Sequence, residues 1–206
     1  PGAIIIVAMT ADSAVDHEPA GHDTTRINRS RQDFTGVDNV WLFGYGSLIY
    51  KVDFPFLERR PATIRDWSRR FWQGSHDHRG TRERPGRVVT LIPEDGAACT
   101  GMAYRVTPAT FGQLDFREKN GYLRLAATLD FGDGQSVEGL VYIAAPGNAA
   151  WLGEADTAEI ARHVAGAAGP SGSNSEYVFK LAQALRDLGT EDSHVFAVEA
   201  ILRRMG

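Results

Sequence analysis

Cysteine is scarce in this sequence. The 206 residues include a single cysteine, Cys99, which excludes an internal disulfide and a cysteine-based metal site. One cysteine also fits a reducing compartment. Basic residues are not in excess, because 22 Lys and Arg stand against 26 Asp and Glu, for a formal net charge of −4. This charge balance argues against a nucleic-acid partner.

Long hydrophobic runs are missing as well. The apolar run Ile4–Met9 is far shorter than the roughly 20 residues that span a bilayer. No basic segment precedes it, as a secretory signal requires. We therefore expect a cytoplasmic protein with no membrane partner.

The first part of the chain carries no folding pattern. From Thr10 to about Asn39 the sequence is polar and lacks periodicity, which is typical of a segment with no core to bury. We predict a flexible N-terminal extension over residues 1–39. The length of the chain then leaves one domain, residues 40–206.

Strand signals dominate the first half of this domain and helix signals the second half. Pro93-Glu94-Asp95-Gly96 and Gly132-Asp133-Gly134 are turn sequences that predict two hairpins. The strands are expected at Val40–Phe43, Ala62–Trp72, Arg87–Ile92, Cys99–Val106, Leu123–Phe131 and Val137–Ala144, and the helices at 107–121, 156–168, 173–188 and 191–205. Strands before helices predict an α+β fold, a small β-barrel or curved mixed sheet flanked by C-terminal helices.

A glycine-rich segment follows the first strand. In Phe43-Gly44-Tyr45-Gly46-Ser47 the glycines let a ligand approach the main chain, and successive N–H groups form an anion-binding turn. A tight connection with Tyr45 in the core is an equally good interpretation of this stretch. The segment is neither a dinucleotide fingerprint nor a phosphate loop, because the third glycine and the Gly-Lys-Ser/Thr sequence are missing.

Other polar clusters have ordinary interpretations when taken alone. Glu118, within Asp115–Tyr122, fits a solvated helix residue. His76-Asp77-His78 could be a metal pair, but without a third ligand group a polar loop is the better interpretation. Arg69 and Arg70 near Trp72 are weak evidence for nucleic acid, and Cys99 is expected as a small apolar strand residue.

Together these segments form an ordered set. The runs F-G-Y-G-S-L-I, D-F-P-F, R-R-F-W-Q-G-S, H-R-G-T, P-G-R-V-V-T-L, A-Y-R, D-F-R-E-K-N-G-Y, L-V-Y-I, W-L-G and G-P-S-G-S-N-S-E-Y stand in that order. The set resembles the ChaC family of glutathione-specific γ-glutamylcyclotransferases, over about Val40 to Leu202. Many ordered blocks are more specific than any single motif.

The resemblance implies a reaction and a site. Glutathione would cyclise at its γ-glutamyl unit, yielding 5-oxoproline and cysteinylglycine, with Glu118 as general acid/base. The substrate-binding loop would be Leu42, Phe43, Gly44, Tyr45, Gly46 and Ser47. The family fold is a small β-barrel with flanking helices. The resemblance implies no metal and no cofactor, and it leaves the oligomeric state open.

Further residues are candidates on chemical grounds. Arg79 and Arg87 could bind the glycine carboxylate of glutathione, although structural ion pairing is at least as good an interpretation. Tyr177 lies in a matched block and could face the pocket. Phe116 and Tyr122 are expected to desolvate Glu118 and raise its pKa.

The neighbours of Glu118 raise further expectations. The side chains of Arg117 and Lys119 should diverge from it. Asn120, where the family commonly has glycine, should tolerate a left-handed backbone. Two other functions stay open: a cyclotransferase for other γ-glutamyl compounds, and a non-catalytic protein that binds γ-glutamyl metabolites.

Overall fold

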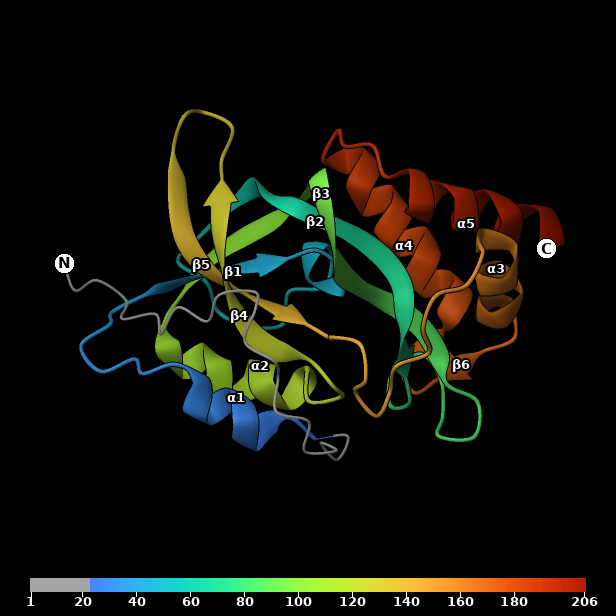
Figure 1. The fold of residues 1–206 in the computed structure, drawn as a ribbon, viewed down its shortest axis with the longest axis horizontal. Coiled ribbons are helices and arrows are strands. Elements are labelled where there is room, and N and C mark those ends of the chain that lie inside the picture. The colour runs from blue at the N-terminus through green and yellow to red at the C-terminus, as the bar shows by residue number, and fades with distance from the viewer. Residues whose placement is uncertain (1–22) are drawn as a thin grey trace.

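Five strands form a closed barrel at the centre of the molecule (Figure 1). The structure is a computed structural model that describes residues 23–206, so the apolar run Ile4–Met9 lies outside the described residues. The strand order is β1-β3-β2-β4-β5, and it confirms the predicted α+β barrel. The strands are β1 (Val40–Gly44), β2 (Glu58–Ser75), β3 (Gly86–Val106), β4 (Leu123–Asp130) and β5 (Ser136–Ile143).

The barrel closes around one parallel pair. Strand β1 pairs antiparallel with β3 and parallel with β5, while β4 and β5 form the predicted hairpin. Strands β2 and β3 make a much longer antiparallel hairpin, from Glu58↔Arg105 to Ser75↔Gly86. Figure 1 shows this hairpin running from the barrel to the C-terminal helices.

The predicted hairpin turn at Pro93–Gly96 is wrong. Both halves of β3 pair with β2, and the turn-like residues form a bulge between the pairs Trp67↔Pro93 and Arg65↔Ala98. Opposite them Asp66 has a φ of 65°, and its carboxylate accepts a hydrogen bond from the Gly96 N–H at 2.8 Å. The turn composition therefore marks a bend inside one strand rather than a reversal of the chain.

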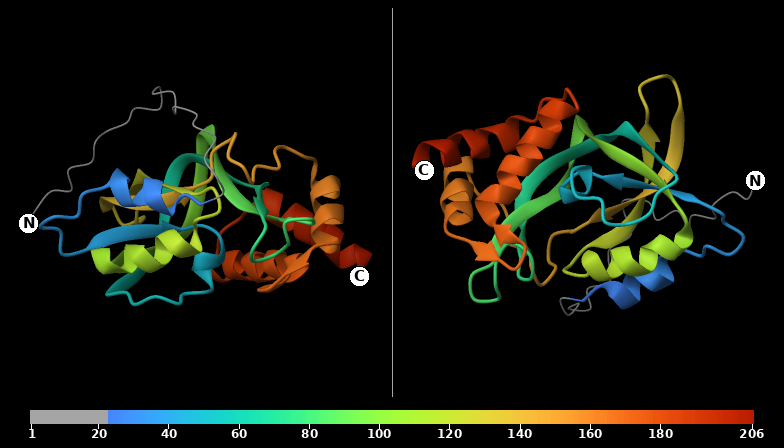
Figure 2. Two further views of the ribbon diagram at one scale, coloured as in Figure 1. Left: turned by 90° about the horizontal axis from the view of Figure 1, so that it is seen from below. Right: turned by 180° about the vertical axis from the view of Figure 1, so that it is seen from behind.

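Three C-terminal helices pack beside the β2–β3 hairpin, as Figures 1 and 2 show. Each begins at a polar N-cap: Asp156 accepts from the Glu159 N–H, Ser173 from the Glu176 N–H and Asp192 from the Val195 N–H. These caps satisfy N–H groups that a helix leaves without a partner. The helices are α3 (Thr157–Ala165), α4 (Asn174–Asp187) and α5 (Ser193–Met205), and the two-residue strands β6 (Ala168–Gly169) and β7 (Gly172–Ser173) precede α4.

The other helical segments lie earlier in the chain. The predicted helix from Thr107 divides into the 3-10 turn η2 (Pro108–Thr110) and helix α2 (Phe111–Arg117), and a second 3-10 turn, η1 (Ser47–Ile49), follows β1. Helix α1 (Thr25–Arg31) packs against α2 and β4. Within this part of the chain, Thr24 and Asn28 are buried polar residues bonded to the domain.

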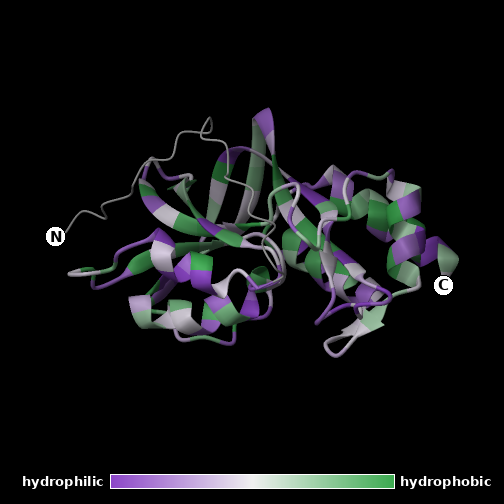
Figure 3. Cartoon of the chain, turned by 60° about the horizontal axis from the view of Figure 1, so that its bottom comes forward, coloured by the Kyte–Doolittle hydropathy of each residue, from purple (hydrophilic) through white to green (hydrophobic). Residues whose placement is uncertain are grey.

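Two hydrophobic clusters meet at the barrel wall. Phe43 belongs to the cluster that also includes α3–α5, whereas Leu42 packs in the cluster with Tyr104, Phe111 and Leu114. Successive strand residues face opposite sides, and hydrophobic and hydrophilic bands accordingly alternate along the strands in Figure 3. Within residues 23–206 no helix is both long and apolar enough to cross a membrane.

Candidate active site

A pocket lies where the carboxyl end of β1 meets the turn after α2. Its walls include the glycine-rich segment, the end of β2, the start of β3 and the N-terminal turn of α4. Phe43 through Ser47, Glu118, Tyr122, Arg79 and Tyr177 all line it. The fold thus brings together segments that are more than a hundred residues apart in sequence.

Close packing explains both glycines of the glycine-rich segment. A Cβ on Gly44 would lie 2.5 Å from the Leu48 Cβ, and one on Gly46 would lie 3.0 Å from Val89 Cγ2 and 3.1 Å from the Tyr177 hydroxyl oxygen. Neither glycine has a positive φ. The segment therefore needs glycine for space at the pocket wall rather than for a left-handed backbone.

Tyr45 is fixed at both of its polar ends. Its hydroxyl donates to the Tyr142 carbonyl oxygen at 2.7 Å, and its own carbonyl oxygen accepts from Arg69 Nε at 2.6 Å. The ring is buried in the core and also lines the pocket. The two interpretations of this segment, a ligand-binding loop and a core connection, are therefore compatible.

Glu118 is the residue at the C-terminal end of α2, where its N–H still donates to the Leu114 carbonyl. Its side chain is 18% exposed and faces the pocket. Burial raises the pKa of Glu118, while the neighbouring Arg117 and His78 lower this pKa. Loss of solvation outweighs the attraction, so the carboxyl group is a stronger base than an exposed glutamate.

Arg117 is the nearest charged neighbour of this carboxylate. Its Nε lies 3.2 Å from Glu118 Oε1, so the expectation that the two side chains diverge is wrong. The helix ends here, and Glu118 has a non-helical ψ of 14°. The guanidinium also donates to Ser47 Oγ at 3.0 Å and to Asp53 Oδ1 at 2.5 Å, which joins the carboxylate to the glycine-rich segment.

The turn after Glu118 is attached to the barrel. Tyr122 donates its hydroxyl hydrogen to the Val89 carbonyl at 2.9 Å, and Gln73 donates to the Asn120 carbonyl at 3.0 Å. The left-handed residue is Gly121, with a φ of 86°, rather than Asn120. Phe116 is 66% exposed and so does not desolvate Glu118 as expected.

Comparison with known proteins identifies this arrangement. The profile of the ChaC-like protein family matches residues 40–205. The chain belongs to the ChaC-like family. It is 43% identical over 179 residues to glutathione-specific gamma-glutamylcyclotransferase 1 of Danio rerio, covering 81% of this chain and 90% of the relative. It is 35% identical to glutathione-specific gamma-glutamylcyclotransferase of Schizosaccharomyces pombe, covering 81% and 93% of the two chains.

Solved structures agree on the ChaC-like fold. A crystal structure of a γ-glutamyl cyclotransferase specific to glutathione from yeast superposes with a TM-score of 0.76 at 30% identity, covering 81% of this chain and 96% of that one. A gamma-glutamyl cyclotransferase structure at 15% identity, with a TM-score of 0.53, shares the fold.

Two of the residues expected in the ChaC-like site lie away from the pocket. Leu42 is fully buried on the other face of β1. Arg87 is buried, and its Nη1 donates to the carbonyl oxygens of Phe71 and Gly153, each at 2.9 Å. Neither side chain is among the residues that line the pocket, so contact of Leu42 or Arg87 with the substrate stays a prediction.

Arg79 and Tyr177 do line the pocket. Arg79 is buried, and its Nη1 donates to Glu176 Oε2 at 2.7 Å and to the Ser173 carbonyl at 3.0 Å. Burial raises the pKa of Tyr177, which keeps its hydroxyl protonated beside Gly46. Arg79 therefore forms a structural ion pair and also lines the pocket, and its contact with the glycine carboxylate of glutathione stays a prediction.

The remaining candidate residues lie either at the pocket wall or in the hydrophobic core. Asp77 and His78 line the pocket, and His78 Nδ1 lies 3.2 Å from Ser171 Oγ. Within residues 23–206, no three His, Cys, Asp or Glu side chains are grouped so that they could hold a metal ion. Cys99 is buried, and burial raises the pKa of its thiol to about 11, which suppresses the nucleophilic thiolate.

Sequence reasoning missed several pocket residues. The wall also includes Gly74, Ser75, Asp77, His78, Arg117, Asn120 and Ser171. Most of these lie within or beside the ordered blocks that carried the family resemblance, such as R-R-F-W-Q-G-S. Membership in those blocks was the available signal, but single-residue chemistry favoured the arginines instead.

Proposed function

We propose that this protein cleaves glutathione into 5-oxoproline and cysteinylglycine, with Glu118 as general acid/base. The relatives named above are glutathione-specific γ-glutamylcyclotransferases and are similar over most of both chains. The observation that carries the catalytic role is the position of Glu118: a poorly solvated carboxyl group faces the glycine-rich segment across one pocket.

The reaction needs a single proton carrier. The α-amine of the γ-glutamyl unit attacks the γ-carbonyl carbon of the same molecule, forming the ring C–N bond. Glu118 takes the proton that the amine loses and then gives it to the departing cysteinyl nitrogen as the amide C–N bond breaks. One carboxyl group with a raised pKa can serve both steps, and the reaction consumes no water.

Positioning supplies a large part of the rate enhancement. Amine and carbonyl already belong to one molecule, so the pocket must hold the folded conformer, an effect worth about 7–11 kcal/mol in favourable cases. The N–H groups of the glycine-rich segment are suited to the developing oxyanion. Within this proposal Arg79 and Tyr177 contact the substrate, and the compartment is the cytoplasm, with which the free Cys99 agrees.

Product formation tests the proposal directly. Purified protein is incubated with reduced glutathione, and 5-oxoproline is measured beside Glu118→Gln and Glu94→Gln. Glu94 is an exposed glutamate paired with Arg70, so its variant controls for the substitution itself. We expect Glu118→Gln to lose about 100- to 10,000-fold in kcat, while Glu94→Gln matches the wild type.

Four outcomes contradict parts of this proposal. No product from the wild type contradicts the activity, and an active Glu118→Gln contradicts the mechanism. Faster turnover of γ-glutamyl dipeptides than of glutathione favours the broader cyclotransferase, and tight binding of glutathione without turnover favours a binding protein. We expect the rate to survive chelation, because no step above uses a metal ion.

A further inference from the structure

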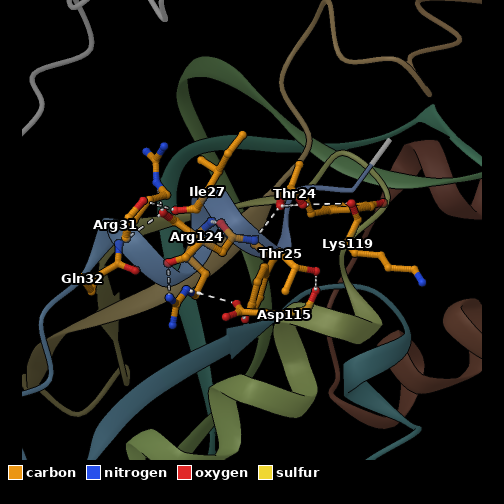
Figure 4. Close-up of polar contacts among 12 residues, drawn as sticks. Thr24, Thr25, Ile27, Arg31, Gln32, Asp115, Lys119 and Arg124 are labelled. Atoms are coloured by element: carbon orange, nitrogen blue, oxygen red, sulfur yellow. Dashed lines mark hydrogen bonds and ion pairs between the residues drawn. The ribbon is translucent and has the colours of Figure 1, made fainter. Parts of the chain in front are cut away.

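Residues 24–31, which precede the barrel, form hydrogen bonds with the turn that follows Glu118. Thr24 donates its N–H to the Lys119 carbonyl at 2.8 Å, and its hydroxyl contacts the Lys119 and Tyr122 carbonyl oxygens at 2.9 and 2.8 Å. Asn28 donates from Nδ2 to the same Tyr122 carbonyl at 2.9 Å. Figure 4 shows Thr24 beside Lys119, with Arg124 and Asp115 on the neighbouring strand and helix. These bonds therefore hold the residues that directly follow Glu118.

The same segment also holds the strand that leaves this turn. Asn28 Oδ1 accepts from the Arg124 N–H at 2.9 Å, and Arg31 Nε donates to the Arg124 carbonyl at 2.8 Å. The Arg124 guanidinium bonds the Asn28 carbonyl and lies 3.3 Å from Asp115. Arg124 and Asp115 are each 2% exposed. The contacts are therefore buried and specific, unlike those of a loosely attached tail.

A buried chain of bonds continues from this segment to the glycine-rich segment. Asp115 Oδ1 accepts the Tyr142 hydroxyl hydrogen at 2.6 Å, and the Tyr142 carbonyl accepts from Tyr45. Both tyrosines line the pocket. The family profile begins only at residue 40, so Thr24 and Asn28 lie outside the matched region although their contacts reach both halves of the site.

We propose that Thr24 and Asn28 are positioning residues that hold the Glu118 side chain in place across the pocket from the glycine-rich segment. This inference rests on the proposed function for its kinetic consequences only. Without the two side chains, the Lys119 and Tyr122 carbonyls lose partners and the turn 118–122 gains freedom. A displacement of about 1 Å at a catalytic group can cost roughly 100-fold in rate.

Thr24→Val in the full chain is the decisive variant, because it removes the hydroxyl with little change in shape. We expect kcat to fall about tenfold with KM nearly unchanged. Thr24→Ser restores the hydroxyl and the rate. Thr35→Val is the matched control, since the Thr35 hydroxyl bonds only its neighbour Asp33 within this exposed turn. Asn28→Asp, which turns a donor into an acceptor facing the Tyr122 carbonyl, should lower kcat further.

Two readouts separate positioning from a general loss of stability. A looser turn admits water to Glu118, so the acidic limb of the rate profile moves to lower pH. The charged and titratable groups around Glu118 are Arg117 from α2, Asp77 and His78 from the loop after β2, and Asp53 after η1, and none of them is changed in these variants. Amide hydrogen exchange should also quicken over residues 118–124 in Thr24→Val and stay unchanged over residues 87–92.

The outcomes distinguish this inference from the proposed function. A folded Thr24→Val with wild-type kcat, an unmoved acidic limb and unchanged exchange over residues 118–124 overturns the positioning role. An equal loss in Thr35→Val overturns it as well. Failure of the wild type to form 5-oxoproline refutes only the proposed function, because the exchange experiment still decides whether Thr24 and Asn28 hold the turn.

Discussion

The effect of replacing Asp192 on the free energy of unfolding can be worked out from the two contacts of its side chain. One carboxylate oxygen caps α5 by accepting the Val195 N–H at 3.0 Å. The other pairs with Arg69 Nη1, and the Arg69 side chain is 2% exposed. Arg69 in turn holds the carbonyl of Tyr45 in the pocket wall. Asp192→Asn keeps the cap but removes the charge that balances a buried guanidinium.

The expected cost follows from keeping one contact and losing the other. Asparagine caps a helix about as well as aspartate, so the cap contributes little to the difference. Removing one partner of a buried ion pair costs about 3–5 kcal/mol. We expect about 3 kcal/mol, the lower end, because the Asp192 side chain is 13% exposed. Asp192→Ala loses the cap as well and should cost about 1 kcal/mol more.

Urea unfolding of both variants measures these differences in free energy. Asp156 provides the matched control, because it caps α3 through the Glu159 N–H at 2.7 Å and has no ion pair among those found within residues 23–206. Asp156→Asn should be nearly neutral and Asp156→Ala should cost about 1 kcal/mol. If Asp192→Asn destabilises the protein no more than Asp156→Asn does, the buried pair is not the source of stability and the reasoning fails.

Three further predictions concern charge and burial. Because burial raises the pKa of Glu118, kcat/KM should fall as the pH drops through a value above the ordinary 4.5. Arg117 lowers this pKa, so Arg117→Gln should move the acidic limb of the kcat/KM profile to higher pH. A shift of that limb to lower pH would contradict the role given to Arg117. A raised pKa means that the ionised carboxylate destabilises the folded state, so Glu118→Gln should be more stable than the wild type at neutral pH in thermal melts, with the difference vanishing near pH 4. Arg87→Met removes the donor from two carbonyl oxygens, one of them buried, and should cost about 2–4 kcal/mol in urea unfolding. A large rise in KM instead would indicate that Arg87 contacts the substrate.

Local sequence signals predicted the helices and strands better than they predicted which strands pair. The capping sequence at Ser173 and the turn at Gly132–Gly134 act over a few residues, and the structure confirms the helix and hairpin that they predict. Pro93–Gly96 has equally strong turn composition but lies in a bulge, because β2 continues to pair on both sides of it. Strand pairing depends on contacts distant in sequence, which local composition does not encode.

The site shows the same limit. Arg79 and Arg87 have identical chemistry, and only the fold decides that one lines the pocket while the other bonds two carbonyls. The period of two along β1 could have separated Leu42 from Phe43 without a structure. Thr24 and Asn28 gave no pattern at all, because single polar residues that bond main-chain carbonyls leave no periodic trace.

The two fixed ends of Tyr45 have a consequence for ligand binding. With its hydroxyl and its carbonyl both bonded to the barrel, the residue between the two glycines has little conformational freedom left to lose. Ordering of this segment is completed when the protein folds, so an incoming ligand does not have to supply that entropy. A ligand should therefore bind at this wall as at a preformed site. The heat-capacity change on binding should then reflect the surface that is buried rather than the folding of a loop.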